Sequence, residues 1–190
     1  MNLSSSRYPK RDGRGFVLSE VWFWNFVVYS FLGFLLEITY VRATGGRGDR
    51  KCLLVLPLCP VYGLGALGIL LLPQWVLSRP PFLFFCGALV ATAAEYTAAV
   101  FYERMLGISF WDYRDLPWNL GGRVCLPFSL AWGCLSLPLV LWLHPLLAPL
   151  LEAIPSPVTW AAAVALGADL LLSAALLRRT GDRSCLRWYA

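Results

Sequence analysis

Long apolar runs without charged residues are the feature that most constrains this chain. A helix needs about 20 apolar residues to cross a hydrocarbon core of about 30 Å, and several runs here reach that length. Of the 190 residues, 58% are hydrophobic and only 14% are charged, against about 25% charged in average soluble proteins. Because such helices take up most of the chain, we expect an integral membrane protein with one domain rather than a soluble enzyme.

The apolar runs predict an all-α fold, a polytopic bundle of about five transmembrane helices. We expect these helices over residues 19–41, 59–77, 82–104, 125–144 and 157–177. Together they form a transmembrane domain over 18–180, preceded by a basic N-terminal arm (1–17) and followed by a basic C-terminal tail (181–190). Pro145 and Pro149 are expected to end the fourth helix, because proline interrupts helical hydrogen bonding.

The basic residues predict the orientation of the bundle. Eleven of the sixteen lysines and arginines fall in the loops after the first and third helices or in the tail. The positive-inside rule then places these regions in the cytoplasm, with the N-terminus outside and the C-terminus cytoplasmic. The net charge of +5 is explained by topology and anionic lipid headgroups, so the bilayer is the expected partner and nucleic acid is not.

The cysteines and the single histidine predict no metal site. None of the six cysteines forms a CxxC pair, and zinc spacing is missing from the sequence. Several cysteines lie in or beside apolar runs, where cysteine behaves as a small hydrophobe. We therefore expect neither a disulfide framework nor a cofactor.

Two segments that open membrane helices resemble each other. Leu56-Pro57-Leu58-Cys59-Pro60-Val61-Tyr62-Gly63 and Leu126-Pro127-Phe128-Ser129-Leu130-Ala131-Trp132-Gly133 share Leu-Pro, a small Cys or Ser, and an aromatic residue before Gly. A basic loop precedes each segment, and a helix with a glutamate near its inner end precedes that loop. The pattern indicates a parallel repeat of helices one-two and three-four. Chance similarity between leucine-rich helices is the alternative.

Acidic residues inside the membrane are the first candidates for a binding site. An ionisable residue at the centre of a helix costs about 2.5–3.5 kcal/mol on insertion scales, so such residues usually face the bundle interior. Glu95 lies midway along the third helix, and Glu37 and Glu103 share the cytoplasmic half with it. These acids either hold the bundle together or bind a cationic or polar ligand. The sequence offers no obvious partner for Asp169.

The loop before the fourth helix is the second candidate region. It is rich in aromatic and turn residues, a composition that is also typical of an interfacial belt. Its polar side chains could instead fold back as a lid or bind a cytoplasmic partner. The proposed binding set is Glu37, Tyr62, Glu95, Glu103, Trp111, Asp112, Tyr113, Asn119 and Arg123, and we predict no catalytic or metal-binding residue.

Several motifs in order resemble a known family. They are Tyr29-Ser30-Phe31-Leu32-Gly33 with Glu37; Pro57-Leu58-Cys59-Pro60-Val61-Tyr62-Gly63-Leu64-Gly65-Ala66; Glu95-Tyr96 with Glu103; Trp111-Asp112-Tyr113; and Asn119, Gly122-Arg123-Val124-Cys125-Leu126, Ser129 and Trp132-Gly133. The pattern is similar to the bacterial family labelled putative ABC-transporter type IV, the CmpB-like permeases. The resemblance covers about residues 25–147 and implies a multi-pass protein of the bacterial plasma membrane.

Three functions fit these observations. The first is a permease-like component of a transporter of unknown substrate. The sequence has no GxxxxGK[ST] motif, so an ABC-type role needs a separate ATPase subunit on the cytoplasmic loops. The second is an enzyme acting on lipid-linked substrates, with Glu95 and Glu103 as acid and base, although no nucleophile–base pair is evident. The third is a regulatory or scaffold protein. We favour the transport component and leave open whether the chain forms a homo-oligomer.

Overall fold

The computed structural model describes residues 15–45 and 52–186, with side chains from Glu20 onward, and confirms a helical membrane bundle. Within these residues, four helices are long and apolar enough to cross a bilayer. They are Glu20–Ala43 within α1 (Gly15–Ala43), α4 (Pro80–Leu106), the continuous helix Leu126–Glu152, and α7 (Ser156–Thr180). Most of the basic arm expected over 1–17 lies outside the described residues.

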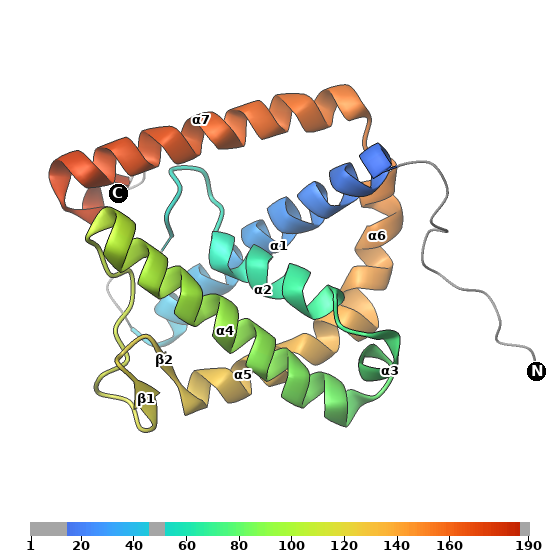
Figure 1. Cartoon of the computed structure of the whole chain (residues 1–190), viewed down its shortest axis with the longest axis horizontal. Coiled ribbons are helices and arrows are strands. Elements are labelled where there is room, and N and C mark those ends of the chain that lie inside the picture. The colour runs from blue at the N-terminus through green and yellow to red at the C-terminus, as the bar shows by residue number, and fades with distance from the viewer. Residues whose placement is uncertain (1–14, 46–51, 187–190) are drawn as a thin grey trace, which may run out of the picture.

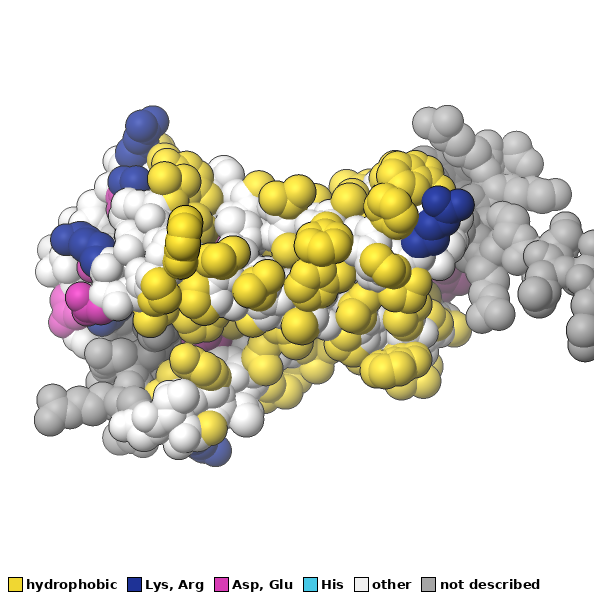
Figure 2. All heavy atoms as spheres, turned by 90° about the horizontal axis from the view of Figure 1, so that it is seen from below, with side chains coloured by type: hydrophobic (Ala, Val, Ile, Leu, Met, Phe, Trp, Pro, Cys, Tyr) yellow, Lys and Arg dark blue, Asp and Glu magenta, His cyan; other side chains and the backbone are white. Residues whose placement is uncertain are grey.

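The helices α1, α2 (Pro60–Leu70), α4, α5 (Leu126–Pro138) and α7 run back and forth along the long axis of the molecule, whereas α6 (His144–Glu152) turns across it, as Figure 1 shows. The beginning of α1 and the end of α7 lie at opposite ends of this axis, which is the arrangement that an odd number of crossings requires. Figure 2 shows apolar side chains over the middle of one lateral face and charged side chains gathered toward its two ends. The long helices also expose large apolar side chains, with Leu89 of α4 at 71% and Leu171 of α7 at 75%, as expected of helices that face the hydrocarbon layer of a bilayer.

The second crossing differs from the single helix predicted over 59–77. The structure has α2 (Pro60–Leu70), a turn at 71–73 and the one-turn helix α3 (Gln74–Leu77). Eleven residues of helix extend only about 16 Å, too short to cross a hydrocarbon core. Pro60 is at the start of α2, where proline is tolerated, and Pro73 precedes α3. The non-helical segment 52–59 leads into α2 and is hydrogen-bonded to α7.

This non-helical segment is mostly buried, and α7 accepts two of its backbone hydrogen bonds. Leu54 is 1% exposed, and the backbone N–H groups of Val55 and Leu56 donate to Ser173 Oγ and Asp169 Oδ2, both at 3.1 Å. Irregular backbone at membrane depth is tolerated only where protein groups satisfy it. Asp169, for which the sequence offers no obvious partner, therefore completes the second crossing.

Glycines let α2 pack between α1 and α4. A Cβ atom on Gly63 would collide with Ser30 of α1, and one on Gly68 would lie 2.6 Å from Val90 of α4. Small residues at such positions allow close backbone approach between membrane helices. As a result, α2 connects the α1 side of the bundle to the α4 side.

The fourth crossing is longer than the helix predicted over 125–144. It comprises α5 (Leu126–Pro138), a π-helical turn (Leu139–Leu143) and α6 (His144–Glu152). Pro145 and Pro149 therefore do not end it, although both were expected to. Pro145 follows the π-helical turn and occupies the first turn of α6, and a local change of helical pitch allows the backbone to accommodate proline.

The remaining elements close the end of the bundle where α4 and α7 finish. The strands β1 (Asn119–Leu120) and β2 (Val124–Cys125) form an antiparallel pair between α4 and α5. After α7, the 3-10 helix Arg183–Leu186 places Leu186 at 1% exposure in a core with Leu54 and Leu177. The 3-10 helix after α7 thus packs against Leu53 and Leu54 of the non-helical segment.

Candidate functional site

A cavity of about 240 Å³ lies between the α1–α2 pair and the α4–α5 pair. Its walls come from α1, α2, α4, α5 and the π-helical turn, and nearly all of its lining side chains are apolar or aromatic. The lining residues with polar atoms in their side chains are Tyr29, Tyr62, Glu95, Trp132 and Ser136. An apolar hollow with a few convergent polar groups is the usual form of a small-molecule site.

Among the described residues, Glu95 is the only acidic one that lines this cavity, and it is 3% exposed. Its Oε1 accepts a hydrogen bond from the Tyr113 hydroxyl at 2.8 Å, and its Oε2 accepts one from Trp132 Nε1 at 2.8 Å. Both donors are neutral, and no lysine or arginine of the described residues lies within ion-pair distance of the carboxylate. The structure thus holds a carboxyl group deep in the bundle without a basic partner from the described chain.

A second acid, Glu37, is connected to the cavity through the side chains of Tyr62 and Trp132. The Tyr62 hydroxyl donates to Glu37 Oε1 at 2.7 Å. The Tyr62 ring meets the Trp132 ring edge to face, with centroids 5.1 Å apart, and Trp132 in turn donates to Glu95. A continuous chain of contacts therefore joins Glu37 on α1 to Glu95 on α4.

Tyr113 brings the loop before α5 into this network. Its ring stacks on Phe128 with centroids 4.8 Å apart, and its hydroxyl reaches Glu95. Burial raises the pKa of Tyr113, and the neighbouring Glu95 carboxylate raises it further. The hydroxyl therefore stays protonated over the physiological pH range and remains a donor.

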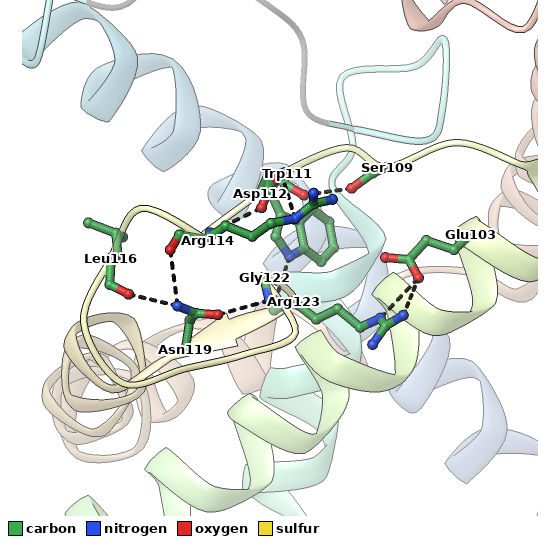
Figure 3. A network of polar contacts seen from close by, with 9 residues as sticks. All are labelled: Glu103, Ser109, Trp111, Asp112, Arg114, Leu116, Asn119, Gly122 and Arg123. Carbon is green, nitrogen blue, oxygen red and sulfur yellow. Dashed lines mark hydrogen bonds and ion pairs between the residues drawn. The ribbon is translucent and has the colours of Figure 1, made fainter.

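The other residues of the loop form a separate polar network, shown in Figure 3. Arg123 donates from Nε and Nη2 to Glu103 Oε2 at 2.9 and 2.7 Å, and these bonds raise the pKa of Arg123. The side-chain amide of Asn119 donates to the carbonyls of Arg114 and Leu116, while its oxygen accepts from Gly122 N–H. These bonds fix the shape of the loop.

Trp111 and Asp112 belong to this second network. Trp111 Nε1 donates to the Arg123 carbonyl at 2.8 Å, and Asp112 pairs with Arg114 at 3.2 Å. Gly122 has a φ of 73°, and a Cβ atom there would lie 2.6 Å from Asp112 Oδ1. A side chain at this position would be strained and would displace Asp112.

The predicted site residues therefore fall into two groups. Tyr62 and Glu95 line the cavity, and Glu37 and Tyr113 are hydrogen-bonded to them. Glu103, Trp111, Asp112, Asn119 and Arg123 form the loop network. Glu95 and Glu103 are about 12 Å apart along α4 and bind different partners, so the structure does not bring them together as an acid–base pair. Within the described part of the chain, no three His, Cys, Asp or Glu side chains are placed to hold a metal ion.

The proposed binding set omitted two side chains that complete these contacts. Trp132 joins Tyr62 to Glu95, and its position opposite Tyr62 in the repeat alignment was the available signal. His144 Nδ1 and the Tyr29 hydroxyl lie 3.0 Å apart, which links α1 to α6 beside the cavity. No pattern in the sequence pointed to this pair.

Comparison with known proteins agrees with this architecture. The model of the family described as Putative ABC-transporter type IV matches residues 24–174, a range that includes both networks and most of α7. Neither the comparison with curated proteins nor that with solved structures found a match. With its four long apolar helices and this match over most of its length, the chain is a membrane protein that belongs to the putative ABC-transporter type IV family.

Proposed function

We propose that this chain is the permease component of a transporter, and that its ligand occupies the cavity between the α1–α2 and α4–α5 pairs. The observation that carries the proposal is the position of Glu95, a 3% exposed carboxyl group in the wall of an otherwise apolar cavity. Acidic residues inside membrane bundles commonly mark ion or substrate pathways. Membership of a transporter family supports the same function.

A separate ATPase subunit would supply the energy, because the sequence has no GxxxxGK[ST] motif. We place its docking surface on the loop network at the end of the bundle where α4 and α7 finish. Trp118 on this loop is 83% exposed, and the Asn119 bonds hold the surrounding backbone in place. Arg178 and Arg179 lie in the last turn of α7, so the positive-inside rule favours the cytoplasm for this end.

A photocrosslinking amino acid at Trp118 tests the docking surface in cells. We expect it to capture a protein that carries a GxxxxGK[ST] motif and hydrolyses ATP after purification. The matched control is the same amino acid at Trp75, which is 55% exposed on α3 at the opposite end of the bundle. Capture of no ATPase from Trp118, or equal capture from both positions, would contradict the proposal.

The second test concerns the cavity. The captured ATPase, reconstituted with the Glu95→Gln variant, should bind as it does to the natural chain but lose any stimulation by the transported ligand. Glu152→Gln, at an exposed position at the end of α6, is the control. Full stimulation by the Glu95→Gln variant would remove the cavity from the ligand path.

A further inference from the structure

The lining of the cavity combines one buried carboxyl group with aromatic rings, and this combination defines the chemistry of a ligand. We propose that the cavity binds a lipophilic quaternary ammonium cation that reaches it from the bilayer. The inference rests on the proposed permease function, since it names the ligand class of the same cavity.

The charge of Glu95 calls for a positive partner. Its two oxygens accept bonds from Tyr113 and Trp132, which carry no charge, and no basic side chain of the described residues pairs with it. An isolated carboxylate in an apolar environment is unstable and takes up a proton or a cation. A cation in the cavity would lie against this carboxyl group and neutralise it.

The aromatic rings favour a quaternary ammonium over a primary amine. Tyr29, Tyr62 and Trp132 all line the cavity, and aromatic faces attract cations through the ring quadrupole. A primary ammonium has three N–H donors that need acceptors, whereas the Glu95 oxygens already accept bonds and the other lining residues are mostly apolar. A quaternary ammonium has no N–H group to satisfy and suits these walls.

The mouth of the cavity opens toward lipid. Leu36 of α1 and Leu135 of α5 line the cavity, and each is 39% exposed. A ligand with an apolar body would therefore pass between α1 and α5 without crossing water. A cavity of about 240 Å³ limits that body to a short aliphatic chain, so we use hexyltrimethylammonium as the probe.

Isothermal titration calorimetry of the purified full chain in nanodiscs tests the inference without any ATPase. We expect hexyltrimethylammonium to bind the natural chain at least 10-fold more tightly than the Glu95→Gln variant. Hexanol and hexyl sulfate, which share the chain but not the charge, should not compete. Glu95→Asp keeps the negative charge and should restore part of the affinity, whereas Glu152→Gln should bind like the natural chain.

Thermal unfolding of each variant in the same nanodiscs separates binding from folding. If Glu95→Gln and Glu95→Asp unfold at similar temperatures but only Glu95→Asp binds, the charge is responsible and the inference is supported. Equal affinity of the natural chain and Glu95→Gln, or equal competition by hexanol, would overturn it. Failure of both variants to fold would leave Trp132→Phe as the test, which should weaken binding several-fold; unchanged affinity in that variant would also overturn it.

Two sources of the cation are distinguishable. The specific signal, taken as the difference between the natural chain and Glu95→Gln, is measured in phosphatidylcholine discs and in discs of an uncharged glycolipid, so that lipid charge does not change the local concentration of the cation. A smaller signal in phosphatidylcholine assigns the cavity to a lipid headgroup that competes with the probe, and equal signals assign it to a free cation. If no cation binds but the Trp118 crosslink still captures an ATPase, this inference fails while the permease function stands.

Discussion

Glu95 and Glu103 lie on the same helix, yet the protein treats them differently. Glu95 is 3% exposed and accepts hydrogen bonds from two neutral donors, Tyr113 and Trp132. The Glu103 side chain is 32% exposed and forms an ion pair with Arg123, whose side chain is equally exposed. The comparison shows that α4 carries two kinds of acid. The charge of Glu103 is balanced by Arg123, whereas a proton or a ligand has to balance that of Glu95.

The two acids also differ in what their loss should cost. A buried donor that loses its acceptor costs about 1–3 kcal/mol, whereas an exposed ion pair contributes about 0–1 kcal/mol. Glu37 and Asp169 resemble Glu95, because each accepts a bond from a neutral donor. We call acids that accept hydrogen bonds from neutral donors the interior class, and acids in exposed ion pairs the exposed class. Unfolding measurements on substitutions at these four acids or their donors can test whether the two classes differ in their contribution to stability.

The largest loss of stability is expected for Glu95→Ala. The substitution leaves the Tyr113 hydroxyl and the Trp132 N–H without this acceptor, so we expect about 2–5 kcal/mol from two part-buried donors. Unfolding in mixed micelles by added denaturing detergent measures the change. Glu152→Ala, at an exposed position, should be close to neutral. If Glu95→Ala is as stable as Glu152→Ala, the interior class does not exist.

Asp169→Ala should cost about 1–3 kcal/mol, because it removes the hydrogen bond that the backbone N–H of Leu56 donates to Asp169 inside the bundle. Asp169→Asn keeps an oxygen acceptor at the same place and should recover more than half of the loss. The same unfolding assay measures both variants, with the exposed Asp115→Ala as control. An Asn variant no better than the Ala variant would show that the negative charge, rather than the hydrogen bond, is what matters.

Tyr62→Phe should have a smaller effect, about 1–2 kcal/mol, because it removes one hydrogen bond to Glu37 and keeps the ring contact with Trp132. Tyr62→Ala loses that packing as well and should be clearly less stable than Tyr62→Phe in the same unfolding assay. Identical stability of the two variants would show that the ring contact between Tyr62 and Trp132 does not contribute to stability.

The smallest effect is expected for Glu103→Gln, about 1 kcal/mol or less, and it should depend on salt. Raising the salt from about 0.05 M to about 0.5 M screens exposed charges, so the stability difference from the natural chain should shrink. Reversing the pair with Glu103→Arg and Arg123→Glu together should restore most of the loss. A large difference that persists at high salt would place Glu103 in the interior class.

Local patterns predicted the long helices well. Runs of about 20 apolar residues allow little except a membrane helix, and α1, α4 and α7 lie within a few residues of their expected bounds. The second crossing was not predictable in this way. Its apolar composition suits a helix, but residues 52–59 are non-helical, and Ser173 and Asp169, far along the chain, accept the N–H groups of Val55 and Leu56.

The candidate site was predictable in its acids but not in its contacts. Rarity of acidic residues within membrane helices pointed to Glu95, and the aromatic loop pointed to Tyr113. The fold of the loop over α4 decides these contacts. It brings Tyr113 to Glu95 and Arg123 to Glu103. Trp132 was overlooked because an aromatic residue on a membrane helix is ordinarily a packing or interfacial residue.

The dependence of the second crossing on α7 has a consequence during synthesis. Leu56 leaves the ribosome 113 residues before Asp169, a delay of about 6–23 s at about 5–20 residues per second. During that time its N–H group has no Asp169 to bind, so we expect the early chain to wait at the membrane surface or inside the insertion machinery. Residues 52–59 would then reach their final conformation only after α7 has been inserted. An early segment of the chain thus depends for its folding on a helix that is translated much later.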